Sequence, residues 1–147
     1  MFGLFKKKER TFPPFEDLKN SSIKNKFFTR VARWDWLDES KIHVIDNNAP
    51  RMITMDPWPQ HIFLEAKGQI TIHEFVYEMA SQYGRKETIP NELDKTVLEI
   101  IDSLLKDKLI TLIESKLDLP YYFDKPISKQ NNEKANKLML EDGLIKE

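Results

Sequence analysis

The chain has 147 residues, which is the size of a single domain. Its 23 Lys and Arg residues nearly balance 24 Asp and Glu residues, and the net charge of −1 provides no overall basic field for DNA or RNA. Cysteine is absent, which excludes disulfides, thiol nucleophiles and Cys-ligated zinc.

The first ten residues, MFGLFKKKER, place apolar side chains before a basic cluster. A secretory signal has the opposite order, with about 7–15 apolar residues after the charges. No run elsewhere approaches the ~18 apolar residues of a membrane span, so we expect a cytoplasmic protein with no such span. We predict a frayed basic tail here; contact of Phe2, Leu4 and Phe5 with a membrane surface is the alternative.

Residues 27–55 predict a meander of three antiparallel strands. Large apolar side chains alternate with polar ones in three short runs, which is the period-two pattern of a strand. These side chains are Phe28, Trp34, Trp36, Ile42, Val44, Ile53 and Met55. Asp- and Asn-rich clusters at 38–40 and 46–50 supply the turns.

Two helices are predicted after the meander. Asp56 and Pro57 suit the N-cap and first position of a helix that we expect Gly68 to end. Thr71 and Glu74 have the spacing of a capping box. The apolar residues behind them recur at helical spacing, which predicts a second helix that runs to about residue 83.

A third helix is predicted from about residue 90 to 108, followed by a strand at 109–114. A short helix within 15–26 precedes the meander, and a helix at 129–142 follows an extended segment around 120–126. We therefore expect an α+β fold with a winged-helix core at 27–114. A basic tail and N-terminal extension occupy 1–26, and a C-terminal extension with a helix occupies 115–147.

The residues for catalysis are not in place. The three histidines are His43, His61 and His73, and they fall on different predicted elements. No serine stands in a Gly-x-Ser-x-Gly elbow, and the chain has no glycine-rich phosphate loop. The acidic pairs on the helices fit solvated faces. We predict a protein that is not an enzyme and that has no cofactor and no metal site.

Two binding functions follow from a winged-helix core. In a DNA-binding protein the third helix should be basic, but residues 90–107 hold five acidic side chains against two lysines, a net charge of −3. A peptide could instead add a strand to a free edge of the sheet, at residues 51–55. Two alternatives stay open: a nucleic-acid-binding regulator, and a structural interaction protein whose own segment 117–123 covers that edge.

Part of the chain resembles the PqqD-like family, which comprises small peptide-binding proteins of pyrroloquinoline quinone biosynthesis and related recognition domains for ribosomally made, modified peptides. The resemblance covers residues 51–114. It rests on Gly68, Thr71 and Glu74 in a Gly-x-x-Thr-x-x-Glu spacing, on the preceding run MDPWPQHIF and on the run LLKDKLI that ends the third helix.

The resemblance implies a protein without cofactor or catalysis that presents a precursor peptide to a modifying enzyme. The peptide would lie as a strand beside the third strand and against the third helix. Carried onto this sequence, the peptide-binding residues are Arg51, Met52, Ile53 and Thr54, facing Glu92, Lys95, Thr96, Glu99 and Ser103. The acidic face of the helix would favour a peptide with Lys or Arg.

Overall fold

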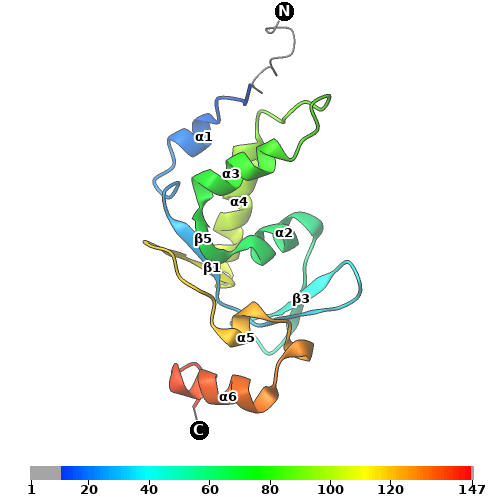
Figure 1. Cartoon of the computed structure of the whole chain (residues 1–147), viewed down its shortest axis with the longest axis vertical. Helices are drawn as coiled ribbons and strands as arrows, with labels where there is room; N and C mark the ends of the chain where they lie inside the picture. Colours follow the sequence, from blue (N-terminus) through cyan, green and yellow to red (C-terminus); the bar gives the residue numbers. More distant parts are fainter. Residues whose placement is uncertain (1–10, 147) are drawn as a thin grey trace, which may run out of the picture.

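The computed structural model describes residues 11–146 (Figure 1). Within this range the chain forms two three-stranded antiparallel sheets and six α-helices, which confirms the mixed α and β content. The predicted basic tail at 1–10 lies outside the described residues. In chain order the elements are α1 (Glu16–Lys19), β1 (Phe27–Arg30), β2 (Trp34–Trp36), β3 (Ile42–Ile45), β4 (Met52–Thr54), α2 (Pro57–Glu65), β5 (Lys67–Thr71), α3 (Ile72–Ser81), α4 (Leu93–Lys106), β6 (Ile110–Ile113), α5 (Tyr121–Asp124), the 3-10 turn η2 (Ile127–Lys129) and α6 (Asn132–Glu141).

The first sheet has the order β5-β1-β6, so its middle strand comes from the N-terminal side of the chain. The predicted meander is wrong in this respect, because its first strand is two strands that belong to different sheets. Phe28, Thr29 and Arg30 are all buried in succession, as expected of a middle strand that is covered on both faces. Phe28 and Trp34 have the same parity, so the alternating pattern could not reveal the break between them.

The second sheet has the order β2-β3-β4 and is the predicted meander in shortened form. Trp34 lies opposite Val44, and Val44 lies opposite Ile53, so these three side chains share one face. The side chain of Gln60 on α2 accepts a hydrogen bond from the N–H of Ile42 (2.8 Å), which ties α2 to β3.

The capping box that opens α3 is confirmed. The N–H of Glu74 donates to Oγ1 of Thr71 (3.1 Å), and the N–H of Thr71 donates to Oε1 of Glu74 (3.0 Å). Gly68 does not end α2 as predicted: α2 ends at Glu65, and Gly68 lies inside β5 at φ +72°. A Cβ at Gly68 would lie 2.5 Å from the carbonyl oxygen of Leu117, so the close approach of this segment requires glycine.

The other predicted helices are longer than those in the structure. The second and third predicted helices correspond to α3 and α4, which are shorter, and the helices predicted within 15–26 and 129–142 shrink to α1 and α6. The segment predicted to be extended around 120–126 contains the single turn α5.

The described part of the N-terminal extension belongs to the main core. Phe15 and Leu18 are buried with the side chains of α2, α3 and α4. The N–H of Leu18 donates to the buried carboxylate of Asp94 on α4 (3.0 Å), and the rings of Phe12 and Phe15 each lie 5.4 Å from Tyr77 on α3.

The C-terminal extension builds a small apolar cluster of its own from Tyr122, Phe123, Ala135 and Met139. Figure 1 shows α6 at one end of the molecule and α1 near the other, with the two sheets between them.

Candidate functional site

The C-terminal extension covers the outer edge of β2. The carboxylate of Asp35 accepts hydrogen bonds from the N–H (3.0 Å) and the hydroxyl (2.8 Å) of Ser128 in η2. It also accepts the N–H of Trp36 (2.8 Å), which points away from β3 because the flanking residues bond to that strand. Nη2 of Arg33 adds a bond to Oε1 of Gln130 (2.8 Å). Asp35 and η2 therefore occupy the edge at which a further strand would pair with Trp36.

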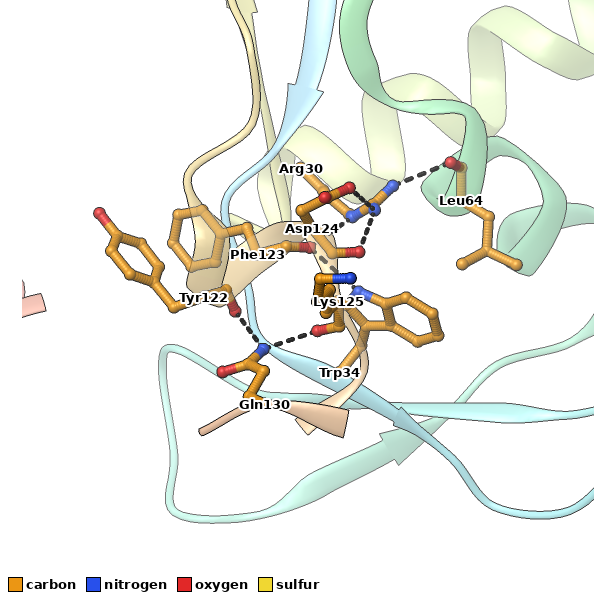
Figure 2. Close-up of polar contacts among 8 residues, drawn as sticks. All are labelled: Arg30, Trp34, Leu64, Tyr122, Phe123, Asp124, Lys125 and Gln130. Atoms are coloured by element: carbon orange, nitrogen blue, oxygen red, sulfur yellow. Dashed lines mark hydrogen bonds and ion pairs between the residues drawn. The ribbon is translucent and has the colours of Figure 1, made fainter. Parts of the chain in front are cut away.

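A buried arginine holds the covering segment in place. In Figure 2 the guanidinium of Arg30 lies between the carboxyl ends of α5 and α2. Its Nε and Nη2 donate to the carbonyl oxygens of Phe123 (2.8 Å) and Asp124 (2.9 Å), and its Nη1 donates to that of Leu64 (2.8 Å). The indole of Trp34 donates to the same Phe123 oxygen (3.0 Å). Side chains of the core thus hold the C-terminal extension by hydrogen bonds to its backbone carbonyl groups.

The surroundings of Arg30 favour its positive charge although its side chain is buried. Its side chain is only 3% exposed, and burial lowers the pKa of Arg30 to about 10, with Asp124 and Glu65 acting in the opposite direction. The group still carries its proton at neutral pH. The carbonyls at the end of a helix form the negative end of its dipole, so a cation at the end of α2 is stabilised there.

The outer edge of β4 is open. Alternation in an antiparallel pair turns the backbone groups of Arg51, Ile53 and Met55 toward β3, and the bonds at the two ends of the strand follow this pattern. The N–H and C=O groups of Met52 and Thr54 therefore point outward. Within residues 11–146 no other strand pairs with this edge. Both residues are exposed, Met52 at 42%.

The turn between β3 and β4 is anchored on the end of α4. The side-chain amide of Asn47 donates to the carbonyl oxygens of Val31 (3.1 Å) and Lys108 (2.9 Å), and that of Asn48 donates to the carbonyl of Asp107 (3.1 Å). Lys108 has a left-handed conformation at φ 60°. These bonds hold the open strand in a fixed position, which preorganises its edge.

An ion pair supports the same turn. Nε of Arg51 donates to Oδ2 of Asp46 (2.7 Å). This bond, followed by the bond from the N–H of Asn48, holds the pKa of Asp46 below its usual value. The side chain of Arg51 is nevertheless 70% exposed, so most of it remains accessible beside the open edge.

The predicted site residues divide into two groups in space. Arg51, Met52, Ile53 and Thr54 lie on or beside the open strand, while the predicted residues of α4 are all exposed: Glu92, Lys95, Thr96, Glu99 and Ser103. The end of α4 near Ser103 is the one that contacts the β3–β4 turn. Glu92 and Lys95 instead line a hollow beside Phe15 and Asp17, about 12–16 Å from Ser103 along the helix axis at ~1.5 Å per residue.

The segment 117–123 lies at β5 and Arg30, and not along β4. The N–H of Leu117 donates to the carbonyl of Gly68 (3.0 Å), and the side chain of Gln69 donates back to the carbonyl of Leu117 (3.0 Å). The alternative in which this segment covers residues 51–55 is therefore wrong.

The histidines are dispersed as predicted, with His43 on β3, His61 on α2 and His73 on α3. His61 and His73 lie against the rings of Phe75 (6.0 Å) and Tyr77 (4.8 Å). No group of three or more His, Asp or Glu side chains that could hold a metal ion occurs among residues 11–146. No helix in that part of the chain is long and apolar enough to cross a membrane.

No protein-family model matches the chain, and neither a curated protein nor a solved structure is found to be similar to it.

Sequence reasoning missed the residues that close the β2 edge, namely Arg30, Asp35 and Ser128. One signal was present, because Arg30 interrupts an apolar strand in the stretch FFTRVA. A charged side chain inside a strand that is buried on both faces needs partners, which could have been anticipated. The identity of those partners had no local signature, because two of the three carbonyl groups lie more than 90 residues away and the third lies 34 residues away.

Proposed function

We propose that this protein is a non-enzymatic module that binds an extended peptide as an additional strand along β4. The observation that carries the proposal is the contrast between the edges of one sheet: β2 is covered by the chain itself, and β4 presents outward N–H and C=O groups. Strand addition uses such groups for affinity and the neighbouring side chains for specificity.

The order of the elements supports a winged-helix core related to the PqqD-like family. The chain runs α2, β5, α3, α4, β6, which is three helices with a strand between the first two and another after the third. β1 occupies the middle position in their sheet, between β5 and β6. In a protein of this type the bound peptide is a ribosomally made precursor that is passed to a modifying enzyme.

The length and charge of the β4 edge indicate which peptides it would bind. Two outward-facing residues, Met52 and Thr54, pair with about three residues of an added strand. The exposed carboxylate of Glu99 on α4 favours a peptide that carries Lys or Arg, whereas that of Asp102 is already paired with Lys106 (2.9 Å). So short a ladder gives modest affinity by itself, because ordering a flexible peptide costs free energy.

The decisive experiment removes one outward N–H from the edge. The probe is a 12-residue peptide selected from a random displayed library on the immobilised full-length chain and then synthesised. Thr54→Pro deletes an N–H that faces outward and spares the bonds to β3, so binding should weaken by ~10-fold or more. Thr54→Val, which keeps the N–H, should bind normally.

Amide NMR shifts locate the bound peptide. We expect the largest changes at Met52, Thr54 and the adjoining end of α4. Changes confined to α3 or to the C-terminal extension, or equal binding by the Pro and Val variants, would contradict the proposal. A library that yields no binding peptide would do so as well.

A further inference from the structure

A hollow adjoins the point at which β4 passes into α2. It has a volume of about 230 Å³ and is lined by Pro57, Trp58 and His61 of α2 and by Met79 and Gln82 at the end of α3. Trp58 remains 36% exposed although it is a large aromatic side chain. Pockets that hold whole small molecules usually enclose ~300–1,000 Å³, so this hollow is of a size for a single side chain.

The hollow lies on the side of α2 that is turned away from β3. Gln60 points toward β3, since its side chain bonds to the N–H of Ile42 (2.8 Å) and the carbonyl of Ser40 (2.8 Å). At about 100° per residue, Trp58 is about 160° away from Gln60 around the helix. His61 lies within about 60° of Trp58, on the same side of α2. A ligand on the outer edge of β4 therefore approaches the hollow without crossing β3.

The chain also limits the distance between the edge and the hollow. Trp58 follows Thr54 by four residues, and an extended chain spans at most ~3.6 Å per residue, so their Cα atoms are no more than ~14 Å apart. A strand that pairs with Thr54 and continues in the direction of α2 covers that distance with at most about four residues.

We propose that this hollow is an anchor site for one large apolar side chain of the peptide that pairs with β4. The inference rests on the proposed function and specifies its ligand: an extended peptide with an aromatic residue or Leu within about four residues of the paired segment. The indole of Trp58 and the thioether of Met79 offer ring and sulfur contacts to such a side chain. The anchor would add the specificity that the short backbone ladder lacks.

The test compares two exposed tryptophans in the full-length chain. Trp58→Ala should weaken binding of the selected peptides by ~10-fold or more. Trp36→Ala is the matched control, because Trp36 is exposed to a similar extent (42%) but lies on β2, away from the hollow. Replacing the apolar anchor residue of the peptide by Ala should have the effect of Trp58→Ala, and the two changes combined should cost little more than either alone.

The outcomes separate the two proposals. Peptides that shift the Met52 and Thr54 amides but bind the Trp58→Ala variant normally overturn the anchor and leave strand addition intact. Peptides that lose affinity with Trp58→Ala yet leave those amides unshifted overturn strand addition, and with it the anchor as described here. Circular dichroism and thermal unfolding check that each variant is folded.

Discussion

The sheet of β2, β3 and β4 has two edge strands, of which one is covered by another segment of the chain and the other is not paired with a further strand in the described residues. At β2 the outward N–H of Trp36 is bonded by Asp35, and η2 lies against the strand through Ser128. At β4 the outward groups of Met52 and Thr54 face no strand among residues 11–146. An unprotected edge invites pairing with any extended chain. Closing one edge directs such pairing to the other, and this is the arrangement that selective strand addition needs.

The two edges also differ in how they are supported. β2 is covered by a segment held from far away in the sequence, through the carbonyl groups that Arg30 binds (Figure 2). β4 is held through its own turn, in which Arg51 bonds to Asp46 five residues away and Asn47 and Asn48 bond to the end of α4. Removal of the Arg30 side chain should therefore open the edge of β2, whereas β4, whose turn is held by a separate set of bonds, should keep its position.

The largest expected effect comes from Arg30→Met. The substitution keeps much of the apolar length but leaves the carbonyls of Phe123, Asp124 and Leu64 without their donor. We expect a loss of about 3 kcal/mol in the free energy of unfolding. Urea denaturation measures this loss, and amide hydrogen exchange should show that residues 120–141 lose protection before the main core does.

Two variants control for charge. Arg30→Lys keeps the cation but cannot bond to all three carbonyls, so we expect it to lose part of the unfolding free energy that Arg30→Met loses. Arg51→Met removes an arginine whose side chain is 70% exposed and should change stability by less than about 1 kcal/mol. An Arg30→Met variant with the stability and exchange pattern of the original protein would contradict the role given to Arg30.

A smaller effect is expected from Asp35→Ala. It removes the acceptor for both hydrogen bonds of Ser128 and for the N–H of Trp36, which should cost about 1–2 kcal/mol. With the β2 edge uncovered, we expect self-association that rises with concentration, measured by analytical ultracentrifugation.

Ser128→Ala is the milder counterpart of Asp35→Ala. It removes the hydroxyl bond and keeps the bond from the backbone N–H, so it should remain closer to the original protein. If Asp35→Ala stays monomeric and η2 keeps its protection from exchange, Asp35 does not close this edge.

The same contrast explains what the sequence could predict. The capping box of Thr71 and Glu74 and the strands around Val44 are encoded by local spacing, and the structure confirms them. The split between β1 and β2 is not encoded by local spacing. It arises because β1 pairs with β5 and β6, which follow it by about 40 and 80 residues. The place of residues 51–55 at the end of the predicted meander indicates a binding edge, but the cover on β2 depends on tertiary contacts that no periodicity in the sequence reports.

The smallest effect concerns the turn that supports the open edge. The bond from Arg51 and then that from the N–H of Asn48 lower the pKa of Asp46 below its usual value of about 3.8. A carboxylate with a lowered pKa in the folded state contributes stability above the unfolded pKa and loses it as the pH falls through the folded value. We therefore expect NMR titration of the Asp46 carboxyl to give a midpoint below 3.8, and Arg51→Gln to raise it. Because the side chain of Arg51 is largely exposed, 1 M salt should reduce the shift. An unshifted midpoint in the original protein would mean that Arg51 does not brace this turn and remains available to a bound peptide.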